Sequence, residues 1–186
     1  MKVYVKTWDG RDDVTSAYNP VTVIEVETVA ETEEPAKLMV WNHEEWRTVA
    51  TEEITEGKVV FNDVGCRIDQ ALCIRVEGGD DRIADLRKDG SYRFLNLGAD
   101  STGEVFTVDY DKSTPFGEMD PGEDYGLLIY TVDGWVDADS ERLSTGGFTF
   151  EGTSDRLYRI TGPGIASRPF TVEYDEDMDE VVTLRR

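Results

Sequence analysis

The stretch GEVFTVDY, residues 103–110, decides the fold class of this chain, because apolar and polar side chains alternate along it. In an extended segment Phe106 and Val108 point to one side and Thr107 points to the other, as in a half-buried β-strand. The stretch PFTVEY at residues 169–174 has the same alternation. We therefore predict strands with one face in a core and one face in water.

Runs of this kind recur along the whole chain and are separated by turn-forming residues. Glycine, proline, aspartate and asparagine fill the intervals, as in Asp120-Pro121-Gly122 and Gly162-Pro163-Gly164, and these residue types favour tight reversals. Many short strands with such turns predict an all-β sandwich or barrel. We expect strands at residues 2–7, 21–29, 36–41, 58–62, 71–77, 91–97, 103–110, 126–132, 147–150, 156–161, 169–174 and 180–184.

At most one or two short helices are expected. Residues 80–89 begin with aspartates that can cap a helix, Ile83 and Leu86 then fall on one helical face, and Gly90 stands where a left-handed residue would end it. A second helical turn is expected around residues 42–46.

The length of 186 residues suits one large all-β domain or two small ones. The sequence shows no internal repeat, no low-complexity linker and no change of composition, so we expect a single domain over residues 1–186. If the chain divides, the boundary is expected near residues 111–125, the longest stretch without a strand signal.

The charge balance defines the environment and excludes some partners. Forty acidic residues against 19 basic ones give a formal net charge of −21, which repels nucleic acid and anionic membrane surfaces. Arginine is preferred over lysine, and the acids are spread over almost every segment. The Debye length falls to about 3 Å at molar ionic strength, where most self-repulsion is screened. The composition therefore suits a high-salt medium, and an ordinary acidic protein is the alternative.

The N-terminal stretch lacks the apolar run of a signal peptide, and no apolar stretch approaches the ~20 residues that span a bilayer. We expect a soluble chain without a secretion signal and without membrane insertion. The two cysteines, Cys66 and Cys73, are expected to be free thiols, although a local disulfide is left open by their spacing.

The residues indicate no catalytic machinery. His43 is the single histidine, and no Gly-x-Ser-x-Gly motif accompanies it, so we interpret it as a surface residue. With 40 acids, a pair of carboxylates at the spacing of a glycosidase carries no information without a cleft. We expect a protein that is not an enzyme, with no catalytic residue and no cofactor.

Two sequence patterns could indicate a ligand-binding site, and each also has a simpler explanation. Residues 137–141 place acidic oxygens at alternate positions, as Ca²⁺ accepts, but Arg142 stands where an EF-hand loop has glycine, so no metal site is assigned. The tryptophans could form a sugar-binding platform, with Trp135 beside a turn as the best candidate, although packing is the commoner use of aromatic residues in β proteins.

The whole pattern resembles a known group, the small major capsid protein of icosahedral internal-membrane viruses of halophilic archaea. The resemblance consists of size, acidity, many short strands, the missing signal sequence and turns such as Asp120-Pro121-Gly122 and Asp133-Gly134. It implies a single jelly roll that stands upright in the virion capsid. It also implies assembly in the host cytoplasm with a larger jelly-roll sibling, in hetero-oligomeric capsomers at high salt.

Two other classes remain open. One is an Ig-like or lectin-like binding or adhesion module of a halophilic organism, which would bind a sugar or peptide as a monomer. The other is a small hydrolase, which would need a cleft containing a carboxylate whose pKa is raised by burial.

Overall fold

The computed structural model is built of β-strands alone in the part of the chain that it describes. No helix occurs among these residues, and all strand pairs but one are antiparallel. The prediction of an all-β fold is confirmed. The described residues are 4–6, 22–28, 30, 32–42, 44–64, 71–86, 90–111, 113–114, 117–118, 123, 125–139, 147–164, 169–174 and 180–184.

The chain forms two compact units, with the division between Leu95 and Asn96. The N-terminal unit contains residues 9–95, and the C-terminal unit contains residues 96–185 together with residues 1–8. This division lies upstream of the loop at residues 111–125, where the sequence placed its alternative boundary. The single domain over residues 1–186 stays a prediction, and each unit is described by itself.

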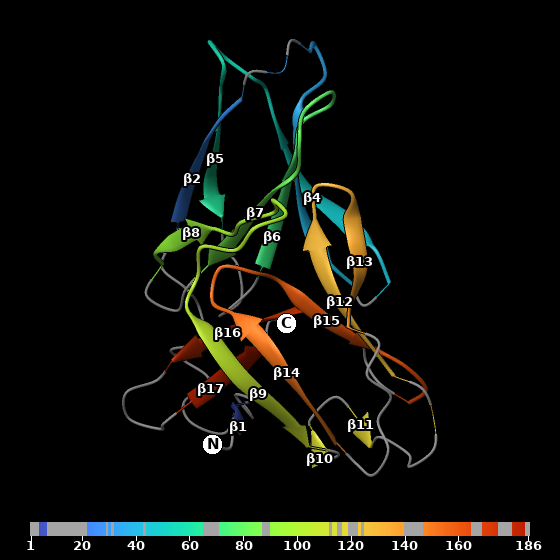
Figure 1. Ribbon diagram of the computed structural model, residues 1–186. Helices are drawn as coiled ribbons and strands as arrows, with labels where there is room; N and C mark the ends of the chain where they lie inside the picture. Colours follow the sequence, from blue (N-terminus) through green and yellow to red (C-terminus); the bar gives the residue numbers. More distant parts are fainter. Residues whose placement is uncertain are drawn as a thin grey trace, which may run out of the picture. The chain divides into compact units, whose positions relative to one another are not determined.

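The N-terminal unit contains a five-stranded antiparallel sheet and a separate two-stranded one (Figure 1). The sheet has the order β4-β3-β6-β7-β8, and β2 pairs with β5. The strands are β2 (Thr22–Glu27), β3 (Ala36–Trp41), β4 (Trp46–Glu52), β5 (Lys58–Val64), β6 (Ala71–Arg75), β7 (Arg82–Leu86) and β8 (Tyr92–Phe94).

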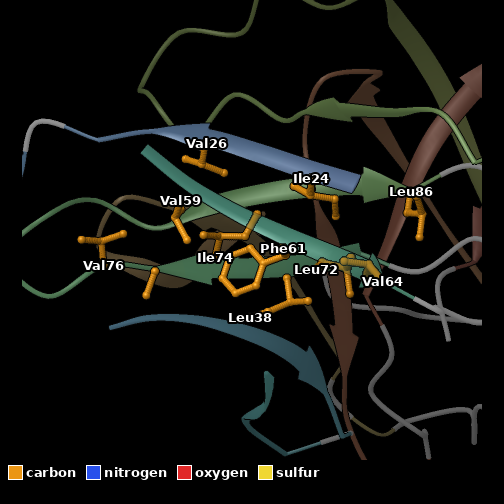
Figure 2. Close-up of a cluster of buried hydrophobic side chains, with 12 residues drawn as sticks. Ile24, Val26, Leu38, Val59, Phe61, Val64, Leu72, Ile74, Val76 and Leu86 are labelled. Carbon is orange, nitrogen blue, oxygen red and sulfur yellow. The ribbon is translucent and has the colours of Figure 1, made fainter. Parts of the chain in front are cut away.

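The core of the N-terminal unit lies between its two sheets. Figure 2 shows Phe61 of β5 in the middle of this core, close to Leu38 of β3 and to Leu72 and Ile74 of β6. Each large apolar side chain removed from water in this way contributes about 1.5–3 kcal/mol. The alternate residues of β3 and β6 supply this face, as their sequence pattern predicts.

The C-terminal unit contains a six-stranded sheet and two strand pairs. The sheet has the order β1-β17-β16-β15-β12-β13, β9 pairs with β14, and β10 pairs with β11. The strands are β1 (Tyr4–Lys6), β9 (Val105–Asp111), β10 (Ser113–Thr114), β11 (Gly117–Glu118), β12 (Gly126–Thr131), β13 (Gly134–Asp139), β14 (Gly147–Thr153), β15 (Tyr158–Thr161), β16 (Pro169–Tyr174) and β17 (Glu180–Leu184). Strand β1 joins the edge of this sheet, parallel to β17.

Three aromatic rings gather in the core of the C-terminal unit. The Phe150 ring lies 5.6 Å from that of Tyr158 and 6.2 Å from that of Phe170, measured between ring centroids. All three side chains are buried, together with Leu127 and Ile160 on neighbouring strands. Tilted and edge-on aromatic contacts of this kind add about 0.5–1.5 kcal/mol per pair beyond their burial.

The helix expected at residues 80–89 is wrong, because residues 82–86 form strand β7. Neither face of this strand is exposed to solvent along most of its length, since four consecutive residues are buried: Ile83, Ala84, Asp85 and Leu86. In a strand buried on both faces, apolar and polar residues do not alternate. The three-residue spacing of Ile83 and Leu86 is then also compatible with the apolar face of a helix. The helical turn expected around residues 42–46 is also wrong where described, since it is the turn of the β3–β4 hairpin.

Strands β4 and β13 were not expected from the sequence. Both are edge strands with largely exposed side chains, so they carry little of the apolar periodicity on which the prediction relied. The jelly-roll connectivity expected from the resemblance is not established by the strand orders seen here.

Candidate functional surfaces

Among the described residues the structure brings together no group of three or more potential metal ligands. Asp137 is exposed on β13, and residues 140–142, which complete the acidic loop, lie outside the described residues. His43 lies outside them as well. No described residue belongs to a helix with the length and apolar character needed to cross a bilayer.

Trp135, the candidate for a sugar platform, is half-buried between two partners. Its ring meets that of Tyr130 edge-on, with centroids 4.9 Å apart and planes at 70°. The Arg159 guanidinium lies over the indole, 4.7 Å from the ring centroid. Burial lowers the pKa of Arg159 from its usual value. The guanidinium therefore occupies one face of the indole. These contacts pack the β12–β13 hairpin against β15.

A polar cluster around Asp155 connects two loops of the C-terminal unit. Its carboxylate accepts hydrogen bonds from the hydroxyl of Ser101, from the backbone N–H of Thr102 at 2.8 Å and from the Asn96 amide at 3.3 Å. Burial would raise the pKa of Asp155, but these hydrogen bonds and one from Thr153 outweigh it and hold the pKa well below its usual value. The carboxylate is thus kept ionised as a structural acceptor.

The N-terminal unit contains an ion pair between strands β7 and β8 in which the carboxylate is fully buried and the arginine is partly exposed. The side chain of Asp85 is fully buried, and its carboxylate accepts a hydrogen bond from Nε of Arg93 at 3.1 Å. The two residues are direct cross-strand neighbours in the ladder. Neither this pair nor the Asp155 cluster was recognised in the sequence, because the chain contains many other acidic residues that look the same. Only the fold shows which carboxylates are buried or hydrogen-bonded.

The edge of each large sheet exposes a strand with a single neighbour. Within the described residues β4 pairs only with β3, and Arg47, Thr48 and Val49 along it are exposed, Val49 at 55%. We call these three residues the β4 edge. Strand β13 similarly pairs only with β12, and its Val136 is 37% exposed. Backbone groups on such an edge can accept a further strand.

Cys73 is a buried cysteine that forms no disulfide, as expected for this residue, and Cys66 lies outside the described residues. Cys73 shares its sheet face with Ile83, and both are fully buried. The thiol is therefore a packing residue in the five-stranded sheet.

No family model, curated protein or solved structure matches this chain.

Proposed function

We propose that this chain is a structural capsid protein that packs with itself and with a larger sibling into capsomers of an icosahedral shell. The observation that carries the proposal is the exposed β4 edge, which belongs to a strand that pairs on one side only among the described residues and has an apolar side chain at its centre. The jelly-roll connectivity of the capsid group belongs to this proposal as an expectation. Nucleic acid and membrane insertion have no part in it.

The charge of the chain restricts where such packing can occur. A net charge of −21 makes copies repel one another in dilute salt. At molar ionic strength the Debye length is about 3 Å, so apolar contacts and backbone hydrogen bonds decide association. Shell assembly through strand edges therefore requires brine, which agrees with the acidic composition.

The experiment is sedimentation of the purified chain in molar NaCl over a range of protein concentrations. We expect oligomers that weaken when Val49→Lys places a charge on the β4 edge. Val132→Lys is the matched control, since Val132 is similarly exposed, at 52%, but lies in the β12–β13 turn. A chain that stays monomeric throughout, or that responds equally to both substitutions, would contradict the proposal.

The high-salt requirement has its own measurement. We expect circular dichroism to show loss of strand signal when the chain is dialysed into about 10 mM salt, where the Debye length is ~30 Å. Full strand content under those conditions would remove the argument for a brine environment.

A second candidate, a binding or adhesion module of a halophilic organism, is favoured by the division into two compact β units. Serial small β domains are a common construction of adhesive and binding proteins. Saturable binding of a sugar or peptide by the monomer in the same sedimentation experiment would support this candidate. Concentration-dependent assembly without such binding would support the capsid proposal.

A further inference from the structure

The two units have the same strand order, although the sequence shows no repeat. In chain order the N-terminal unit has β2, β3, β4, β5, β6, β7 and β8, and the C-terminal unit has β9, β12, β13, β14, β15, β16 and β17. In each unit the first and fourth strands pair, and the other five form a sheet in the order third, second, fifth, sixth, seventh. Strand β1 and the β10–β11 pair are additions to the C-terminal unit.

We infer that the chain consists of two copies of one seven-stranded β module. The inference goes beyond the proposed function and does not need the capsid role, but two modules would replace the single jelly roll expected with that role. The assembly experiment and the experiment below can therefore fail separately. It rests on five local features that occur at matching places in both units.

The first feature is the hairpin between the second and third strands. Trp41 pairs with Trp46 across this hairpin in the N-terminal unit, and Tyr130 pairs with Trp135 in the C-terminal unit. Both aromatic pairs meet edge-on, with centroids 5.4 Å and 4.9 Å apart. The two hairpins therefore close on the same kind of aromatic contact, with the tryptophan at the same place on the third strand.

The second feature is the hydrogen bonding inside the turn. The Asn42 side chain accepts a hydrogen bond from the backbone N–H of Glu44 at 3.1 Å, two residues ahead. The Thr131 hydroxyl accepts one from the N–H of Asp133 at 3.2 Å, also two residues ahead. Asn42 and Thr131 each follow the first aromatic residue directly, so the two turns are built on the same plan.

The third feature is a β-bulge at the same position in both hairpins. The register shifts between Leu38 and Met39 in the N-terminal unit and between Leu127 and Leu128 in the C-terminal unit. Each leucine lies three residues before the aromatic residue of its strand, and each is buried. A bulge re-aims an edge strand and is a specific feature of a fold, so two matching bulges are strong support for equivalence.

The fourth feature is the path from the fifth to the sixth strand. Leu38 pairs with Ile74 and Leu127 pairs with Ile160. Four residues beyond each isoleucine stands a glycine with positive φ, Gly78 at 77° and Gly164 at 71°. That backbone conformation favours glycine, and it occurs at the same distance beyond the paired isoleucine in both units.

A buried polar residue completes the correspondence on the sixth strand. Asp85 and Thr171 are each fully buried, and each stands eleven residues beyond the isoleucine of the fifth strand in its unit. Both also pair with a polar residue on the seventh strand, Arg93 and Thr183 respectively. A polar cross-strand pair thus occupies the same place in both sheets.

The sequence hides this repeat because few side chains are identical. Between residues 38–49 (LMVWNHEEWRTV) and 127–138 (LLIYTVDGWVDA), only the first leucine and the tryptophan match. The remaining agreement lies in size and polarity, as in valine against isoleucine or tryptophan against tyrosine. A sheet needs apolar character on the correct face more than a particular residue, so a repeat can survive in structure after the letters have diverged.

The test exchanges one hairpin for the other in the full-length chain. The first chimera replaces residues 38–49 with the sequence of residues 127–138, which keeps the bulge, the turn and the core-facing leucine in place. The control chimera inserts the sequence of residues 128–139 instead, which has the same length but is shifted by one residue. This shift turns each side chain to the opposite face of its strand.

Thermal unfolding in molar NaCl, followed by circular dichroism, compares the two chimeras with the parent chain. We expect the in-register chimera to keep a cooperative transition within about 8 °C of the parent. We expect the shifted chimera to lose the transition of the N-terminal unit. An in-register chimera that unfolds like the shifted one would overturn the equivalence, as would a shifted chimera as stable as the parent.

A second measurement needs no substitution. In the isotope-labelled parent chain, nuclear Overhauser contacts should report Leu38 opposite Ile74 and Leu127 opposite Ile160. They should also place the additional residue of the bulge at Val49 in β4 and at Ala138 in β13. A regular ladder in one hairpin and a bulge in the other would refute the inference even if both chimeras folded.

Discussion

Replacing Arg93 by leucine should strongly destabilise the N-terminal unit, because it removes a cation that lies next to the buried Asp85 carboxylate. Asp85 is fully buried, and Nε of Arg93 lies 3.1 Å from its carboxylate. The arginine itself is partly solvated, with its side chain 36% exposed. The substitution therefore removes the charge at the water side of the pair and leaves the enclosed charge behind.

The magnitude follows from that asymmetry. Breaking a buried ion pair by removing one partner costs about 3–5 kcal/mol, since the remaining ion stays desolvated. Solvent reaches the arginine end of this pair, so we expect the lower end of the range, about 3 kcal/mol. For a unit of this size each 1 kcal/mol lowers the melting temperature by about 4–8 °C, so the expected loss is about 12–24 °C.

Urea unfolding of the full-length chain in molar NaCl measures this free energy. The exposed control is Lys58→Met, which removes a cation 2.8 Å from Glu25 on the surface. Hydrogen bonding and charge attraction from Glu25 raise the pKa of Lys58, but this lysine is solvated, so we expect a far smaller effect. If Arg93→Leu and Lys58→Met change the free energy of unfolding equally, the buried pair does not act as described.

A double variant separates lost attraction from a stranded charge. In the C-terminal unit the matching cross-strand positions hold Thr171 and Thr183. The combination Asp85→Thr and Arg93→Thr removes both charges and should recover part of the stability lost in Arg93→Leu, since no desolvated charge stays in the sheet. A double variant as unstable as the single one would refute the reasoning.

Three further predictions concern the cores and the Asp155 cluster. Phe61→Ala should lower the free energy of unfolding by about 4 kcal/mol through the cavity it leaves, whereas Val23→Ala, at an exposed position of β2, should have little effect; equal losses in urea unfolding would contradict the core assignment. Gly103→Ala should lower the melting temperature, because a Cβ there would lie 2.7 Å from the backbone nitrogen of Asp155, and a variant that melts with the parent would show that the loop is not packed so closely. Because the folded-state pKa of Asp155 lies below the unfolded value of 3.8, its contribution to stability is present above about pH 4 and is lost as the pH falls below it. The acid-side fall in the free energy of unfolding should therefore be shallower in Asp155→Asn, and an unchanged slope would argue against the lowered pKa.

The sequence alone was sufficient to predict several of the strands. Residues 36–41, 169–174 and 180–184 were expected as strands and are β3, β16 and β17 with the same bounds. In residues 169–174 Phe170, Val172 and Tyr174 recur at every second position, which is the period of a strand. The other two segments are short, mostly apolar runs that contain the β-branched residue valine. The alternation and the turn residues predicted the all-β class, and composition and charge led to the expectation of a saline environment.

Only the tertiary structure decided the elements without such alternation. Strand β7 is buried on both faces, and its residue spacing led to the prediction of a helix. Thr171 of β16 was predicted to face solvent from the alternation, but it is fully buried. The edge strands β4 and β13 expose most of their side chains and gave no apolar period. In each case burial depends on what covers the second face of the sheet, which local sequence does not encode.

The ion pair of Asp85, the hydrogen-bonded carboxylate of Asp155 and the matching of the two units were also decided at this level. A chain with 40 acidic residues does not reveal which carboxylates are enclosed until the strands are paired. The repeat is visible in strand order, in the bulges and in the glycines at positive φ, whereas few residues are identical between the two units. Sequence determines which residues can form a strand, and long-range pairing determines which strands meet, because hydrogen bonds between strands join residues far apart in the chain.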